Sequence, residues 1–272
     1  MGADVNYEVE YNNRARVPEH PALIADWARD AAGYRERNPP RSISYGPGRR
    51  NTIDFFAGGG KGPIVVFIHG GYWQAFDSSS FSHLAAGLNA HGISVAMPSY
   101  DLCPGVTVDR IIQQMRMAVR ELARLGRPLV ISGHSAGGHL AACLLAIDWP
   151  AIDASLPRDL VIAAYSISGL FELGPLVKTS INNALRLDDA AARAASPLFW
   201  RAPARGSLDA VVGEIESAEY FRQSKSIVDV WGRAGLPTQF GTVAGANHFA
   251  AIAPLADPGS PMVVRLRELA AR

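Results

Sequence analysis

The chain has 272 residues, of which 48% are hydrophobic and 19% are charged, and its formal net charge is +1. This length and composition predict one large folded domain and exclude a disordered chain. The near-neutral charge gives no electrostatic reason to expect nucleic acid or an anionic membrane as a partner.

The amino terminus and the cysteines bear on the compartment. Residues 1–6 contain no basic segment followed by an apolar run, so no secretory signal is predicted, and Asn6 replaces the Ser or Thr of a myristoylation motif. No stretch is long and apolar enough to span a bilayer. Cys103 and Cys143 are too few for a disulfide framework and are expected in the core. These observations favour a cytoplasmic protein.

The first segment of the predicted single domain, residues 1–40, is polar and interrupted by prolines. We expect it to form an arm laid over the domain, with a short helix over residues 22–34. Residues 43–56 then predict two short strands around a turn at residues 46–48. The second strand alternates polar and apolar residues, which is typical of a half-exposed strand.

A series of continuous apolar runs follows, each typical of a strand buried on both faces. They cover residues 64–68, 93–97, 129–132, 160–165 and 208–212. Helical stretches lie between them at residues 80–90, 108–125 and 136–147. A helix near residues 218–232, a strand near 238–243 and a last helix from residue 261 complete the pattern. This alternation predicts an α/β fold with a mostly parallel central sheet and helices on both faces.

Residues 169–206 interrupt the alternation. They contain Pro175, Pro197 and Pro203 and no clear strand. We expect a small insertion here, above the carboxyl edge of the sheet, placed to act as a cap on a site.

The strongest chemical signal is the Gly-His-Ser-Ala-Gly sequence of residues 133–137, which matches the G-x-S-x-G nucleophile elbow. An apolar strand precedes it and a helix follows. A sharp turn between them holds the serine in a strained conformation that exposes its hydroxyl, and the helix amino terminus faces the developing negative charge. This context predicts that Ser135 is a nucleophile rather than a serine that only caps a helix.

A Gly-rich loop at residues 69–72 follows directly on the first buried strand, where the other half of an oxyanion hole is built. We assign the backbone N–H groups of Gly71 or Tyr72, together with that of Ala136, as oxyanion donors. Tyr72 and Trp73 are candidates for lining a pocket, and simple packing explains them equally well.

The general base must be a histidine, and in the fold that carries this elbow the chain order is Ser, acid, His. Five of the seven histidines precede Ser135, and one of these, His69, is expected to hold its loop. His139 follows Ser135 by only one helical turn, which leaves no room for the acid between them. His248 remains, on the loop after the strand near residues 238–243, and is the predicted base.

The acid should follow the strand of residues 208–212, where Glu214, Glu216 and Glu219 occur and no aspartate does. Glu219 is expected on the next helix, facing away from the site. Composition does not decide between Glu214 and Glu216, because an acid that orients the imidazolium can be Glu as well as Asp.

The motifs of metal and phosphate sites are missing from the sequence. It has no H-E-x-x-H, C-x-x-C or G-x-x-x-x-G-K-[ST] pattern, and residues 58–61 form a turn before a strand. We therefore expect no metal and no cofactor. The expected partner is a small-molecule substrate with an amide or ester carbonyl. Neither nucleic acid nor a membrane is expected as a partner. The assembly considered is a homodimer.

Four stretches together carry a family resemblance. Residues 69–74 read His-Gly-Gly-Tyr-Trp-Gln, and residues 133–140 read Gly-His-Ser-Ala-Gly-Gly-His-Leu. Residues 212–224 read Val-Gly-Glu-Ile-Glu-Ser-Ala-Glu-Tyr-Phe-Arg-Gln-Ser, and residues 247–249 read Asn-His-Phe. From about residue 11 to the carboxyl terminus, the chain resembles the kynurenine formamidase (arylformamidase) branch of the α/β-hydrolases. The resemblance implies the α/β-hydrolase fold.

The resemblance also bears on the acid and the reaction. In that family the acid is usually an aspartate directly before the serine of a Ser-x-Glu pattern, a position that Glu216 holds here. The resemblance therefore prefers Glu216 over Glu214, with a side chain one methylene longer than usual. It implies that Ser135, Glu216 and His248 hydrolyse N-formyl-L-kynurenine to kynurenine and formate through an acyl-enzyme.

An aromatic amine leaving group needs an apolar slot, for which Tyr72, Trp73, Phe171 and Phe249 are the candidates. Asn182 and Asn183 of the insertion are the candidate partners of a charged amino-acid tail. Two alternatives are a broad carboxylesterase with the same machinery and a non-catalytic binding protein, which would usually have lost a triad residue. A dehalogenase would need Asp at the position of Ser135.

Overall fold

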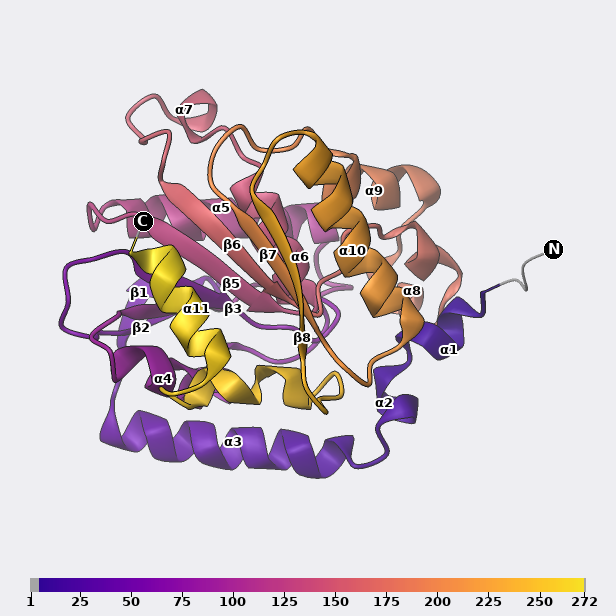
Figure 1. Ribbon diagram of the computed structural model, residues 1–272, viewed down its shortest axis with the longest axis horizontal. Helices are drawn as coiled ribbons and strands as arrows, with labels where there is room; N and C mark the ends of the chain where they lie inside the picture. The colour runs from indigo at the N-terminus through magenta and orange to yellow at the C-terminus, as the bar shows by residue number, and fades with distance from the viewer. Residues whose placement is uncertain (1–4, 272) are drawn as a thin grey trace.

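The computed structural model describes residues 5–271. Residues 1–4, where the predicted arm begins and on which the signal and myristoylation predictions largely rest, lie outside the described residues, as does residue 272. Within the described range, the chain forms one eight-stranded sheet with the order β1-β2-β4-β3-β5-β6-β7-β8 (Figure 1). The strands are β1 (Arg41–Ser44), β2 (Thr52–Phe56), β3 (Ile64–Ile68), β4 (Val95–Pro98), β5 (Leu129–His134), β6 (Val161–Ile167), β7 (Leu208–Gly213) and β8 (Thr238–Val243).

The pairing of the strands confirms the predicted mostly parallel sheet. Strands β4, β3, β5, β6, β7 and β8 pair in parallel, whereas β1 and β2 form an antiparallel hairpin on the outer side of β4. Because all the parallel strands run in one direction, their carboxyl ends share one edge of the sheet. The loops that carry the predicted functional residues therefore start from the same edge.

Helices cover both faces of the sheet, as predicted (Figure 1). The α-helices are α1 (Tyr7–Tyr11), α2 (Asn13–Arg16), α3 (His20–Arg37), α4 (Ala86–Asn89), α5 (Val108–Ala123), α6 (Ala136–Leu145), α7 (Trp149–Ile152), α8 (Asn182–Leu185), α9 (Asp189–Ala194), α10 (Ala218–Arg233) and α11 (Pro261–Ala270). Short 3-10 helices are η1 (Ser78–Ala85), η2 (Gly174–Lys178), η3 (Pro197–Phe199) and η4 (Ala250–Ala256).

Two hydrophobic cores, one on each face, hold the layers together. Strand β3 shows the division, because Ile64, Val66 and Ile68 enter the core formed with α5, α6 and α10, whereas Val65 and Phe67 enter the core formed with α3, α4 and α11. Side chains alternate between the two faces of a strand, so a strand buried on both faces must be apolar throughout. This explains the continuous apolar runs. Cys103 and Cys143 are buried with free thiols, as predicted.

The amino-terminal helices lie along the outside of the sheet layers (Figure 1). Helix α3 is longer than the predicted helix over residues 22–34, since Pro21 lies in its first turn, where a missing N–H is tolerated. Its buried face includes Trp27, Ala31 and Tyr34. These side chains pack near η1, so the arm closes the second core from outside.

Strand β2 departs from the half-exposed strand predicted for residues 51–56, because four of its five residues are buried. The polar residue Asp54 is covered by α3, where Arg35 donates to its carboxylate at 2.6 Å, and Ser78 donates to it at 2.8 Å. The prediction was wrong because the alternation of residue types cannot reveal that an ion pair with another segment buries the polar position.

Residues 169–206 contain η2, α8, α9 and η3, and none of these residues forms a strand. Much of the segment packs inward, with Leu173, Leu176, Leu185 and Ala192 in the first core. The hydrophobic core that α5, α6 and α10 form on one face of the sheet therefore extends into this segment.

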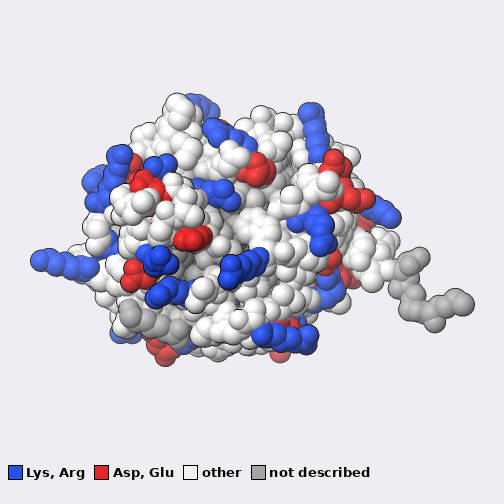
Figure 2. All heavy atoms as spheres, turned by 90° about the horizontal axis from the view of Figure 1, so that it is seen from above, with Lys and Arg blue, Asp and Glu red and all other residues white. Residues whose placement is uncertain are grey.

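The surface carries mixed charge. On the face shown in Figure 2, basic and acidic side chains are interspersed without a large patch of one sign. Among residues 5–271, no helix is long and apolar enough to cross a membrane.

Helix α6 approaches strand β3 more closely than any side chain would permit. A Cβ atom on Gly137 would lie 1.9 Å from the carbonyl oxygen of Ile68. This distance is far inside van der Waals contact, and the obstacle is backbone that cannot rotate away. The junction between β5 and α6 therefore requires glycine at this position.

We expect Gly137→Ala to lower the free energy of unfolding by about 3 kcal/mol or more, because the added methyl group forces α6 away from β3. Urea unfolding of the purified variant measures the loss. Gly62→Ala is the matched control, since a Cβ at exposed Gly62 meets no atom within 4 Å. Equal unfolding midpoints for the two variants would contradict this account of the junction.

Candidate active site

Ser135 stands between β5 and α6 in a backbone conformation that side chains rarely adopt. Its φ is 56° and its ψ is −116°, and its N–H donates to the carbonyl of Ile167 at 2.8 Å. This strained conformation is maintained by the hydrogen bond on one side and the close packing of Gly137 on the other. Ser135 therefore has the sharp strand-to-helix turn that the elbow sequence predicts.

His248 and Glu216 form a hydrogen-bonded pair. The Nδ1 atom of His248 lies 2.7 Å from Oε2 of Glu216, and both side chains are almost fully buried. Glu216 is held in turn by the N–H of Gly213 at 2.7 Å and by the hydroxyl of Ser168, which both donate to Oε1. A carboxylate fixed in this way orients the imidazole and leaves its Nε2 as the nitrogen available to a substrate.

The other two glutamates have different surroundings. Glu214 is exposed, and its carboxylate accepts from the N–H of Gly245 at 2.8 Å. Glu219 lies on α10 and binds Tyr11 and Arg222 instead of His248. The structure thus brings Glu216 rather than Glu214 to the histidine.

The loop after β3 has an unusual backbone. Gly71, Tyr72 and Trp73 have consecutive positive φ values of 103°, 48° and 56°. His69 stabilises the loop, because its Nδ1 lies 2.8 Å from the carbonyl of Gly70 and its ring stacks on Tyr100 at 4.2 Å. The loop is adjacent to Ser135, since a Cβ on Gly70 would lie 3.1 Å from that of the serine. The loop therefore lies directly beside the residue that precedes α6.

Three further histidines near the site are buried. Burial lowers the pKa of His69 and of His139 to about 4, and it lowers the pKa of His134 well below the usual range, with the neighbouring His248 as a second cause. His134 Nε2 lies 2.9 Å from the carbonyl of His248, and His139 Nε2 lies 2.7 Å from that of Ala195. These histidines position backbone segments, whereas His248 alone of the four is paired with a carboxylate.

A cavity of about 430 Å³ opens beside Ser135 and His248. Its wall comes from the arm, from the loop after β3 and from the two residues just before α8, in addition to the site itself. The lining residues are Glu8, Tyr11, Asn12, Asn13, Arg14, Trp27, Gly70, Gly71, Tyr72, Gln74, Ala75, Phe76, Phe81, His134, Ser135, Ser180, Ile181, His248 and Phe249.

Of the four aromatic residues predicted to line a slot, Tyr72 and Phe249 do line this cavity. Trp73 and Phe171 do not, because both are fully buried in the first core, where the Trp73 ring meets His139 edge to face. Their places are taken by Trp27, Phe76 and Phe81. The sequence could not separate Trp73 from Tyr72, because both are aromatic residues of one loop and packing explained them as well as a pocket did.

The insertion asparagines also have structural contacts. Asn182 donates to the carbonyls of Val177 and Leu187, and Asn183 is exposed outside the cavity lining. Several polar residues of the cavity come instead from the arm, which sequence reasoning treated as a cover: Glu8, Asn12, Asn13 and Arg14. The only signals for this role were the polar and aromatic residues clustered around Tyr11 and Asn13.

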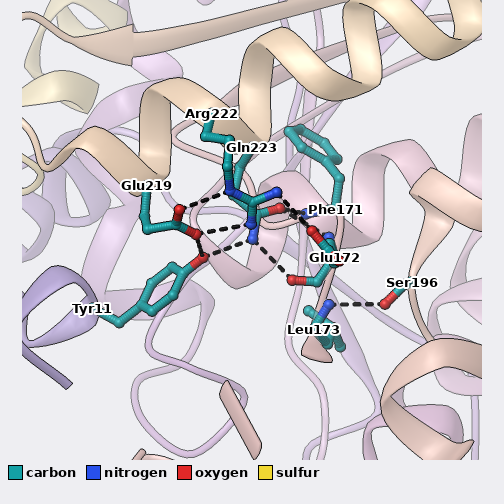
Figure 3. A network of polar contacts seen from close by, with 8 residues as sticks. All are labelled: Tyr11, Phe171, Glu172, Leu173, Ser196, Glu219, Arg222 and Gln223. Atoms are coloured by element: carbon teal, nitrogen blue, oxygen red, sulfur yellow. Dashed lines mark hydrogen bonds and ion pairs between the residues drawn. The ribbon is translucent and has the colours of Figure 1, made fainter. Parts of the chain in front are cut away.

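A buried polar network anchors the arm to α10 and to the start of the insertion (Figure 3). The Tyr11 hydroxyl donates to Glu219 at 2.7 Å and accepts from Gln223 at 2.8 Å. Arg222 binds both oxygens of Glu219 and also reaches Glu172 at 2.6 Å. Burial raises the pKa of the Tyr11 hydroxyl, which keeps it protonated as a donor. The charge of buried Glu219 is thereby neutralised by Arg222 and hydrogen-bonded by the arm.

A second cluster connects this network to the histidine. The Tyr72 hydroxyl lies 2.7 Å both from the carbonyl of Tyr11, to which it donates, and from the hydroxyl of Tyr220. Asn13 donates to the Tyr220 hydroxyl at 2.8 Å. The Tyr220 ring packs against that of His248 with 4.6 Å between their centroids. Arm, loop and α10 therefore meet at the wall of the candidate site.

The described residues contain no cluster of three or more His, Cys, Asp or Glu side chains suited to a metal ion. The groups gathered around the cavity are instead a hydroxyl, an imidazole and a carboxylate. This set is suited to acyl transfer from an amide or ester.

Comparison with known proteins supports this chemistry. The profile of the family described as "Alpha/beta hydrolase family" matches residues 65–270. Over 227 residues, the chain is 29% identical to the kynurenine formamidase of Danio rerio, with 79% of this chain and 76% of that protein covered. It is 28% identical to the kynurenine formamidase of Drosophila melanogaster over 223 residues, which cover 76% and 73% of the two chains. The predicted resemblance to the formamidases is thereby confirmed.

Solved structures agree with the fold. A protein from Silicibacter sp., provisionally named a thioesterase, is 36% identical and superimposes with a TM-score of 0.84 over 96% of this chain and 98% of its own. An esterase from Pyrobaculum calidifontis has a TM-score of 0.72 at 18% identity, over 96% and 94% of the two chains, and shares the fold.

We expect Tyr11→Phe to lower the free energy of unfolding by about 1–3 kcal/mol, because it removes one hydrogen bond from each of two buried groups, Glu219 and Gln223. Thermal or urea unfolding measures the change. Tyr7→Phe provides the control, since Tyr7 lies on the same helix and its hydroxyl has no partner among residues 5–271. A loss of similar size in both variants would show that the network does not anchor the arm.

Proposed function

The chain belongs to the alpha/beta hydrolase family, and we propose that it hydrolyses an aryl formamide such as N-formyl-L-kynurenine, with Ser135 as nucleophile, His248 as base and Glu216 as acid. The observation that carries the proposal is the meeting of Ser135 with the His248–Glu216 pair at one cavity. The similarity to formamidases of two animals supports this substrate.

In the proposed reaction, His248 Nε2 takes the proton of Ser135 as its Oγ attacks the formyl carbon. The carbonyl oxygen becomes an oxyanion facing the N–H groups of Ala136 and of Gly71 or Tyr72, and each such donor stabilises the transition state by about 3 kcal/mol. The C–N bond then breaks, and the arylamine leaves with the proton from His248.

Deacylation repeats these steps with water. His248 takes a proton from the water, whose oxygen attacks the formyl ester of Ser135. The C–O bond to the serine breaks, the serine recovers its proton from His248, and formate leaves. Glu216 remains ionised throughout and holds the imidazole in the orientation that serves both steps.

The cavity supports an aromatic leaving group. Trp27, Tyr72, Phe76 and Phe249 provide flat apolar surface beside the serine. A formyl group has only hydrogen on its acyl carbon, so the loop after β3 can enclose it closely. Residues 169–206 continue the wall through Ser180 and Ile181, and we propose that this segment acts as the cap.

A second candidate is hydrolysis of small esters or thioesters by the same residues. It is favoured by the relative from Silicibacter sp., which is 36% identical and provisionally named a thioesterase. The two candidates differ in the acyl group and the leaving atom, not in the proposed triad.

We expect Glu216→Gln to lower kcat by about 10²–10⁴-fold, because an amide cannot fix the tautomer of His248 or stabilise its charged form. Glu214→Gln is the matched control and should change kcat little, since Glu214 is exposed and binds Gly245. Steady-state assays of both variants, with Ser135→Ala as the reference for lost nucleophile, test the assignment. A larger loss for Glu214→Gln would move the acid to that residue.

The substrate proposal predicts faster hydrolysis of N-formyl-L-kynurenine than of N-acetylkynurenine. The extra methyl group must overfill the acyl site, which corresponds to about 10–200-fold in kcat/KM. The measurement compares both amides with an acetyl ester of similar size. Rapid cleavage of the ester with neither amide consumed would reject the formamidase and leave the esterase.

A further inference from the structure

The cavity contains a cation that the proposed reaction does not use. Arg14 belongs to α2 and lines the cavity wall together with Ser135 and His248. Its side chain is exposed, and among residues 5–271 it forms no ion pair or hydrogen bond. The guanidinium is therefore free to bind an anionic group of a ligand, as arginine binds carboxylates through two parallel hydrogen bonds.

The backbone that carries Arg14 is fixed on both sides. The preceding residue, Asn13, is buried and donates to the hydroxyls of Tyr220 and Tyr72 at 2.8 and 3.3 Å. Tyr11 is anchored by the network of Figure 3, and Val17 on the far side is buried. Little backbone entropy remains to be lost when Arg14 binds a ligand, which favours recognition.

A carboxylate of opposite sign lies on the same wall. Glu8 also lines the cavity, and both of its oxygens accept from Ser180, at 2.7 Å each. These hydrogen bonds lower the pKa of Glu8, so it remains ionised at neutral pH. Within the described part of the chain Glu8 and Arg14 are not paired with each other, so the wall presents separate negative and positive groups.

A ligand with both an ammonium and a carboxylate group complements this wall. We propose that Arg14 binds the α-carboxylate of an amino-acid tail on the substrate, with Glu8 facing its α-ammonium group. The inference rests on the proposed function and makes Arg14 a specificity-determining residue, because an aryl formamide without the tail would gain nothing from it.

The test compares two formamides with the same reacting bond. N-formyl-L-kynurenine has the amino-acid tail, and N-(2-acetylphenyl)formamide retains the ring and ketone without it. We expect Arg14→Gln to raise KM for the first by about 10- to 100-fold with kcat nearly unchanged, since a charge-assisted hydrogen bond is lost. The variant should cleave the second as the wild type does, and Arg14→Lys should recover part of the affinity for the first.

Arg37→Gln is the matched control, because it removes the same charge from an exposed position of the arm that is outside the cavity lining. Arg16 is less suitable, since it borders a second hollow next to Glu216 and His248. If Arg14→Gln changes the kinetics of both formamides equally, or of neither, the inference is wrong and the proposed function stands. A wild-type protein that cleaves neither formamide would overturn both.

Discussion

The backbone of Gly137 lies so close to the carbonyl of Ile68 that no side chain fits between them. Strand β3 and helix α6 are thereby locked at a fixed separation, and the loop that follows β3 lies against Ser135. The parallel sheet places the other two residues of the proposed triad. Strands β5, β7 and β8 end at the same edge, so Ser135, Glu216 and His248, which follow these strands, lie at that edge. The geometry of the site thus depends mainly on backbone packing, which is stiffer than side-chain packing.

The layout of the sheet and the position of the proposed triad could be predicted from sequence because their signals are local. Continuous apolar runs identified the buried strands, and chain order left His248 as the base. Between Glu214 and Glu216, only a family resemblance gave a preference, since both carboxylates follow β7 within three residues. The structure separates them by direction, with Glu216 turned inward to His248 and Glu214 turned outward to Gly245.

What could not be predicted depends on contacts between distant segments. The burial of Asp54 requires Arg35 from α3, and the burial of Glu219 requires Tyr11 and Arg222. No periodicity reports such pairings, because each polar residue by itself is typical of a surface. The arm itself was predicted, but the same limitation hid its contribution to the cavity, which depends on anchoring across about two hundred residues of chain. A charged residue is buried at low cost only where its partner is already held in place.

The family profile matches from residue 65 onward, whereas the arm that forms one wall of the cavity ends before it. In the proposed reaction, the triad comes from the matched region, whereas Arg14 and Glu8, which are proposed to bind the amino-acid tail, come from the arm. We therefore expect substitutions at exposed arm positions such as Arg14 to alter the choice of substrate while the sheet and its elbow stay as they are. Under this proposal, the first forty residues are the place to look for differences in substrate among proteins that share the framework of sheet and elbow.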